Sequence, residues 1–169
     1  METNTYLLAA LVENRPGVLQ RVSGLFRRRN FNIESISVGV SEKPGISRMT
    51  LAVTGDQKVL EQVMKQLNRL VEVIKVSELE RESSVVRELA LVKISTKNMN
   101  SRAEIIQYVN IFRGRVIDAS RDSLIVEITG DTSKVEAFLH MVEEFGIKEM
   151  AKTGLTAMAR GPKVREAEK

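Results

Sequence analysis

The chain has 169 residues, 43% of them hydrophobic, which is enough for one domain or for two small domains with cores of their own. It contains no cysteine, which excludes disulfides, thiolate metal sites and a cysteine nucleophile. The net charge of +4 comes from 26 basic residues interleaved with 22 acidic ones. No apolar run reaches the length of a membrane span, and the start lacks the basic region of a signal peptide, so we expect a cytoplasmic protein with no membrane partner.

The first half of the chain predicts the order strand, helix, strand, strand, helix, strand. Residues Tyr6 to Val12 predict a strand, and an apolar stripe at helical spacing then predicts a helix that ends at Asn30. Asp56 is predicted to be the N-cap of the second helix. The other three strands are predicted from FNIESISVGV, SRMTLAVTG and VEVIKVSEL.

The second half of the chain predicts the same order again. Ser101 and Glu104 form a capping-box signature for its first helix. Arg121 and Asp122 predict a hairpin turn, and Asp131 or Thr132 opens the second helix. The segment GIKEMAKTGLTAM predicts one last strand. The two halves also share a local echo, because LAVTGD and VEITGD each end a strand in Gly-Asp before an amphipathic helix.

These patterns predict an α+β protein with two tandem ferredoxin-like βαββαβ units. We expect the first domain at residues 1–79, a polar linker at 80–88, the second domain at 89–160 and a charged tail at 161–169. A unit of this kind packs both helices on one face of its sheet. The other face then needs cover, which suggests dimerisation or docking.

The residue inventory argues against an enzyme. It offers no Walker loop, no dinucleotide fingerprint and no nucleophile elbow. The one histidine, His140, is expected to be a surface or packing residue. The basic run Arg27 to Arg29 suits a helix C-terminus, where cations complement the dipole. Nucleic-acid binding stays an alternative that only this run and the high pI support, since 4% aromatic content offers few rings for stacking on bases.

The turn between the first strand and helix could bind a zwitterion. Backbone N–H groups at the helix N-terminus favour a carboxylate, and Gly17 lets a ligand approach the backbone closely. The amide of Asn14 could serve an ammonium or a carboxylate, and Asn32 could approach the same end of the fold. The apolar part of the ligand would then meet Val18, Leu19, Ile33 or Ile36. Alternatively, Asn14 and Gly17 are plain turn residues.

The segment NRPGVLQRVSGLFRRRNFNIESI resembles the N-terminal signature of ACT domains, which bind small effectors. Over nearly its whole length the chain resembles the small, regulatory subunit of acetolactate (acetohydroxyacid) synthase. The segments that carry this likeness are GLFRRRNFNIESISVG, SRMTLAVTGDQKVLEQVMKQLNRLVEVIKV, ELALVKIS, IFRGRVIDAS and, most loosely, ARGPK. Residues 1–79 would then be an effector-binding ACT domain, and 89–160 an ACT-like second domain.

The resemblance implies a regulatory role in branched-chain amino-acid biosynthesis. Such a subunit has no cofactor of its own; it binds the large catalytic subunit, which carries thiamine diphosphate, Mg2+ and FAD. It activates that subunit and confers feedback inhibition, usually by valine. The alternative is a free-standing ACT-type sensor that acts on another enzyme.

The resemblance also implies where the effector binds. The effector lies between two ACT domains of a homodimer, at positions that correspond to Asn14, Gly17 and Asn32, with backbone N–H groups near Val18, Leu19 and Ile33. Pro16 departs from the more variable residue of the family and should stiffen the turn. The second half, in STKNMNSRAEI, lacks the turn glycine, so we expect no second effector site there.

Overall fold

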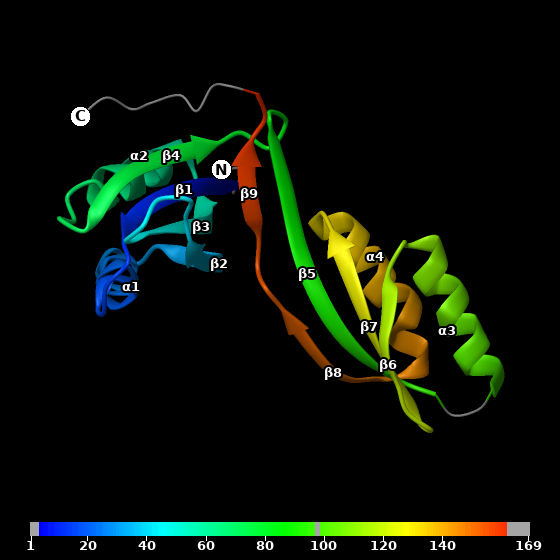
Figure 1. The fold of residues 1–169 in the computed structure, drawn as a ribbon. Coiled ribbons are helices and arrows are strands. Elements are labelled where there is room, and N and C mark those ends of the chain that lie inside the picture. The colour runs from blue at the N-terminus through cyan, green and yellow to red at the C-terminus, as the bar shows by residue number, and fades with distance from the viewer. Residues whose placement is uncertain (1–3, 97–98, 162–169) are drawn as a thin grey trace. The chain divides into compact units, whose positions relative to one another are not determined.

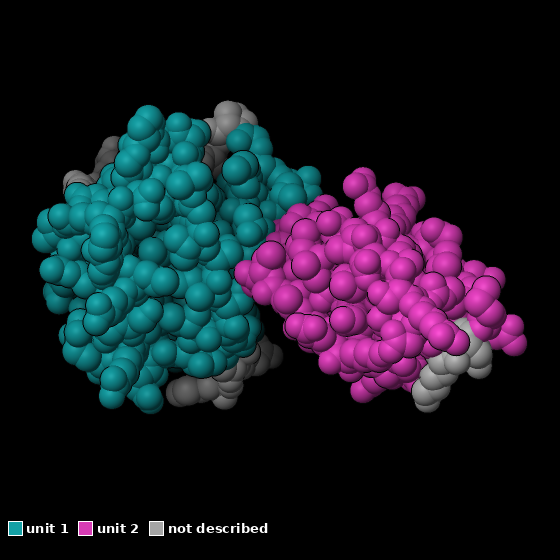
Figure 2. Space-filling view, turned by 60° about the horizontal axis from the view of Figure 1, so that its bottom comes forward, with its two compact units in different colours: residues 1–85, 155–169 teal, residues 86–154 magenta. Residues whose placement is uncertain are grey.

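The computed structural model describes residues 4–96 and 99–161 and divides the chain into two compact units (Figure 2). The first unit consists of residues 1–85 together with the segment from Leu155 onward. The second unit runs from Val86 to Gly154. Each unit has an antiparallel sheet and two α-helices (Figure 1). No helix among the described residues is long and apolar enough to cross a membrane.

The first unit has the predicted βαββαβ order. Its strands lie in the order β2-β3-β1-β4, so that β2 and β4 form the two edges of the sheet. Its elements are β1 Asn4–Glu13, α1 Val18–Arg29, β2 Asn32–Val40, β3 Ile46–Gly55, α2 Gln57–Leu67 and β4 Val73–Leu79.

Alternation along β1 explains which face of this sheet carries the helices. Leu8, Ala10 and Val12 point into one core with the buried stripes of α1 and α2. The α1 helix ends at Asn30, as predicted, because this residue takes the left-handed conformation (φ 56°). Asp56 caps α2 as predicted, since its carboxylate accepts the backbone N–H of Val59 at 2.9 Å.

The second unit repeats this architecture with the strand order β6-β7-β5-β8. Its buried core is made of β5, β7 and the inner faces of both helices. Its elements are β5 Ser84–Ser95, α3 Met99–Ile111, β6 Arg115–Ala119, β7 Ser123–Gly130, α4 Thr132–Val142, a short 3-10 helix Glu143–Phe145 and β8 Ile147–Lys152. The last strand, β9 Thr156–Ala159, belongs to the first unit.

Three local predictions differ from the structure. The α3 helix is described from Met99, so Ser101 lies inside it, and the carboxylate of Glu104 accepts the hydroxyl of Tyr108 at 3.3 Å. Residues 84–88 of the expected linker are part of a strand, because β5 begins at Ser84. The expected single last strand is two, β8 and β9, since Gly154 has a positive φ of 76° that breaks the extended chain. The predicted tail falls, from residue 162 onward, outside the described residues.

The segment 155–161, which we call the strap, belongs to the first unit and covers the sheet face opposite the helices. On β2 the hydroxyl of Ser35 accepts the N–H of Leu155 at 2.8 Å, and the hydroxyl of Ser37 donates to the Leu155 carbonyl at 2.8 Å. On β3 the guanidinium of Arg48 donates to the carbonyl of Ala157 at 3.0 Å. Sequence reasoning expected this face to be covered by a dimer partner or a docked protein, but the strap of the same chain lies over it.

Candidate functional site

The turn before α1 leaves the helix N-terminus open. Gly17 is the N-cap residue, with φ 89° and ψ −14°, and it offers no side chain to cap the helix. At α2 and α4, by contrast, Asp56 and Asp131 accept a first-turn N–H. A Cβ at Gly17 would meet nothing within 4 Å, so the space in front of the helix is free. The first N–H groups of α1 can therefore bind an anion.

Backbone hydrogen bonds fix this turn to its neighbours. The N–H of Asn14 donates to the carbonyl of Gly45, in the β2–β3 turn, at 2.8 Å. The N–H of Glu13 donates to the carbonyl of Glu72, just before β4, at 2.9 Å. The N–H of Arg21 donates to the carbonyl of Gly17 at 3.0 Å, which closes the first turn of α1. Three segments thus hold the turn in one conformation.

Burial decides which of the turn residues could contact a ligand through their side chains and which only through their backbone. Asn14 and Gly17 are exposed, as a binding role requires. Leu19 is 48% exposed and could contact a ligand through its side chain. Val18 is buried in the core, so only its backbone N–H could take part. The expectation of an apolar contact to the side chain of Val18 does not fit this burial.

The expectation that Asn32 approaches the turn within one chain is wrong. Glu13, at the end of β1, pairs with Ile46, whereas Asn32, at the start of β2, pairs with Thr54. These partners are eight positions apart on β3, which is roughly 26 Å at about 3.3 Å per residue. The predicted βαβ order already implied this separation, because the helix between two parallel strands returns the chain to the opposite end of the sheet, and β1 and β2 both run antiparallel to β3.

The β2 strand that carries Asn32 is one of the two edge strands of the sheet. Ile33 and Ile36 are half-buried and pack against the core. At its far end Val38 and Val40 are 47% and 79% exposed. An unpaired, apolar strand edge is a template for pairing with another chain.

Sequence reasoning missed Glu72, Arg15 and Arg21. Glu72 is buried, and its carboxylate pairs with the guanidinium groups of both arginines beside the turn. The available signal was an acid among the valines of VEVIKV. Its partners lie 57 and 51 positions away, however, and no local pattern connects them.

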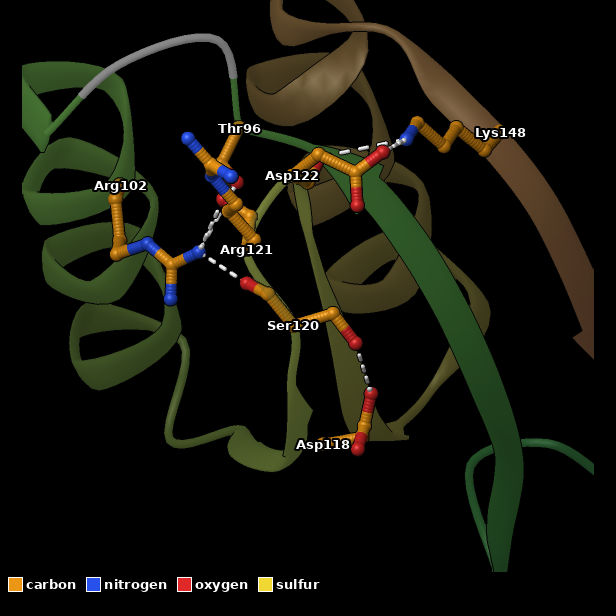
Figure 3. A network of polar contacts seen from close by, with 7 residues as sticks. All are labelled: Thr96, Arg102, Asp118, Ser120, Arg121, Asp122 and Lys148. Carbon is orange, nitrogen blue, oxygen red and sulfur yellow. Dashed lines mark hydrogen bonds and ion pairs between the residues drawn. The ribbon is translucent and has the colours of Figure 1, made fainter.

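In the corresponding corner of the second unit, the side chain of Arg102 links the end of β5 to the β6–β7 turn (Figure 3). The N–H of Thr96 donates to the carbonyl of Asp122 at 2.9 Å, which matches the bond from Asn14 to Gly45 in the first unit. The guanidinium of Arg102 then donates to the Thr96 hydroxyl at 3.3 Å, to the Arg121 carbonyl at 3.1 Å and to the Ser120 carbonyl. Residues 97 and 98 of this loop lie outside the described part of the chain.

The exposed end of this corner is held by an ion pair. Lys148 donates to the carboxylate of Asp122 at 2.7 Å. This hydrogen bond lowers the pKa of Asp122 below its ordinary value of 3.8. Among residues 4–96 and 99–161, no group of three or more histidine or acidic side chains could hold a metal ion.

Family comparisons agree with the two-unit architecture. Residues 8–75 match the model described as an AHAS small subunit-like ACT domain. Residues 87–161 match the model described as the small subunit of acetolactate synthase. The fold and the two matched models therefore define a regulatory protein with an ACT domain.

Individual relatives extend this likeness over nearly the whole chain. A probable acetolactate synthase small subunit from Methanothermobacter thermautotrophicus is 59% identical over 161 residues, which are 95% of this chain and 96% of the relative. The acetolactate synthase small subunit of Mycobacterium bovis is 50% identical over 163 residues, 96% of each chain. The crystal structure of the Thermotoga maritima small subunit has a TM-score of 0.89 at 47% identity and covers 94% of this chain and 99% of its own.

The chain belongs to the acetolactate synthase small-subunit family. It is accordingly a regulatory, non-catalytic subunit of that enzyme. A small subunit of this kind implies a large catalytic subunit as its partner.

Proposed function

We propose that this regulatory subunit activates its catalytic partner and confers feedback inhibition by a branched-chain amino acid, valine foremost. The effector would bind between two copies of the first unit. The observation that carries this proposal is the separation of the predicted site residues: the turn and Asn32 lie at opposite ends of one sheet whose edge strand, β2, is open. One copy alone cannot bring them to one ligand.

A two-fold dimer through β2 would bring the turn of one copy close to Asn32 of the other. If β2 pairs with β2 of a second copy in antiparallel fashion, Asn32 of the second copy comes to the end that carries Val40 and the turn of the first. Each dimer then has two equivalent sites. The exposed Val38 and Val40 would be buried in this pairing.

The chemistry of such a site suits an aliphatic amino acid. The carboxylate would bind the open N–H groups of α1 from Val18 onward, where the helix dipole favours negative charge. The amides of Asn14 and of the second copy's Asn32 offer oxygen acceptors for the ammonium. The side chain would lie near Leu19 and the second copy's Ile33 and Ile36, which are partly accessible.

Feedback follows if the effector prefers one dimer arrangement over another. A ligand shifts an equilibrium only by its difference in affinity between the two states. A coupling of about 1–3 kcal/mol would give useful inhibition. Family membership favours acetolactate synthase as the regulated enzyme over the alternative of a free-standing sensor.

The direct test is a calorimetric titration of the purified chain with valine. Gly17→Asp is expected to weaken binding by about tenfold or more, equivalent to at least about 1.4 kcal/mol, because its carboxylate repels that of the ligand. Gly17→Asn is the matched control. Asparagine has the same shape and tolerates a positive φ comparably, so the difference between the two variants isolates the charge.

Saturable binding that Gly17→Asp loses and Gly17→Asn largely keeps would support the site. Equal binding by wild type and Gly17→Asp would overturn it. If the isolated chain binds no valine, the wild type and both variants are compared in the complex with the catalytic subunit. The readout is then the inhibition of that subunit by valine, and it decides whether the turn is the effector site.

A further inference from the structure

A buried carboxylate lies directly behind the proposed effector turn. The side chain of Glu72 is only 5% exposed. Its Oε1 is 2.9 Å from a guanidinium nitrogen of Arg21 and 3.3 Å from one of Arg15. Arg15 belongs to the turn itself, and Arg21 lies on the first turns of α1. Glu72 therefore links the turn before α1, through Arg15, to the first turns of α1, through Arg21.

The backbone of Glu72 contacts the same turn. Its carbonyl accepts the N–H of Glu13, which in turn pairs with Arg15 through its carboxylate at 2.7 Å. Side-chain and main-chain atoms of one residue thus hold the chain before, within and after the turn. A site that depends on the direction of a few N–H groups needs support of this kind.

Stability alone is a poor explanation for this arrangement. Burying a carboxylate is costly, and an ion pair often only offsets that cost. Within the described part of the chain, the second oxygen of Glu72, Oε2, is buried without a hydrogen-bond partner. Both arginine side chains are more than half exposed, at 53% and 64%, so they contribute little as surface ion pairs.

We propose that Glu72 is a positioning residue of the effector turn. Through Arg15 and Arg21 it orients the N–H groups at the start of α1 toward the effector's carboxylate. This inference rests on the proposed function, because it assigns a role in the same site. Glu72 does not touch the effector.

The variant Glu72→Gln separates positioning from charge, because the two effects have opposite signs. Removing a negative charge beside the turn would, by charge alone, tighten the binding of a carboxylate. Loss of the two ion pairs frees the turn and weakens binding. We expect the second effect to prevail and to raise the dissociation constant for valine by about tenfold, the lower end of the loss that removal of an orienting partner causes at metal sites.

The matched control is Glu88→Gln in the second unit. Glu88 is also a buried carboxylate, with 4% of its side chain exposed, and it pairs with one cation, Lys152, at 3.3 Å. Both variants lose a buried charge, but only one of them is at the turn. Both are assayed in the reconstituted complex for the valine concentration that gives half inhibition and for the maximal activation of the catalytic subunit.

The expected result is a higher half-inhibiting valine concentration in Glu72→Gln, with activation kept and with Glu88→Gln like wild type. Unchanged or tighter inhibition in Glu72→Gln, or an equal shift in both variants, would overturn the inference. If Glu72→Gln does not fold, Arg21→Lys takes its place, because it keeps the charge and loses the planar contact. Unchanged inhibition in that variant would also overturn it. Absence of inhibition in wild type would instead contradict the proposed function.

Discussion

At the scale of single residues, two positions in the left-handed region bound α1, the helix of the proposed site. Gly17 begins α1 at φ 89° and Asn30 ends it at φ 56°. Glycine and asparagine are the residues that adopt this region at least cost. The sequence alone could therefore place this helix and its turn, since each boundary depends on one residue and its own backbone.

The ion pair of Asp122 with Lys148 predicts a specific pH dependence. Because the pKa of Asp122 is lowered in the folded state, the folded chain binds its proton more weakly than the unfolded chain. The stabilisation is present above the ordinary pKa of 3.8 and is lost as the pH falls through the lowered value. The effect should be small, since the side chain of Asp122 is 75% exposed.

Thermal unfolding across an acid titration would measure this effect. Asp122→Asn should show a flatter loss of stability toward low pH than wild type, and Lys148→Met should flatten the profile in the same way. Identical acid profiles in all three proteins would mean that the ion pair does not form in solution.

Residues paired across long separations are the part of the site that the sequence could not predict. Asn14 and Gly17 could be proposed because a strand, a turn and a helix are local patterns. Glu72 was missed because its ion pairs are to arginines more than 50 positions away. Burial of that carboxylate becomes visible only when β4 is placed beside β1.

At the scale of elements, the strap explains how the outer face of the first sheet is covered. A row of small side chains crosses that face through register pairs of Ser37 with Thr50, Thr50 with Ala9 and Ala9 with Ser77. Thr50, Ala9 and Ser77 are buried although they point away from the helices. Small residues allow the strap to lie close to the sheet. The hydroxyl groups of Ser35 and Ser37 form hydrogen bonds with the backbone of the strap.

Substitutions in the strap test its packing. Ala157 is 2% exposed, so Ala157→Arg should overfill the contact and lower the free energy of unfolding by about 1–3 kcal/mol. Its neighbour Met158 is 63% exposed, and Met158→Arg is the control that should change little. Urea unfolding and limited proteolysis at residues 155–161 would report the difference. Equal resistance in the two variants would contradict the close packing of the strap.

The sequence predicted element types better than their ends. The order of strands and helices is confirmed in both units, because it depends on hydrophobic period and turn residues. The capping box at Ser101 was a local signal that a longer helix overrode. The last strand is divided at Gly154, and the part after it, β9, belongs to the first unit. The hydrophobic period of the sequence could not predict this division.

At the scale of the whole molecule, the central claim is that the effector site is shared between two copies. The turn and Asn32 lie roughly 26 Å apart along the sheet of one chain, at about 3.3 Å per residue. An antiparallel pairing of the open β2 edges would turn this separation into two composite sites. Regulation would then follow from the dimer arrangement that the effector stabilises.

Mixing two defective variants tests this claim most directly. Gly17→Asp damages the turn and Asn32→Ala damages the β2 contribution, so neither variant alone should bind valine at wild-type affinity. In a mixed dimer, one site combines both defects, and the other combines two intact halves. After subunit exchange at equal concentrations, we expect about a quarter of the wild-type number of valine sites, with wild-type affinity, by calorimetric titration. Mixtures that regain no such sites would contradict the account, because they would mean that each site lies within one chain.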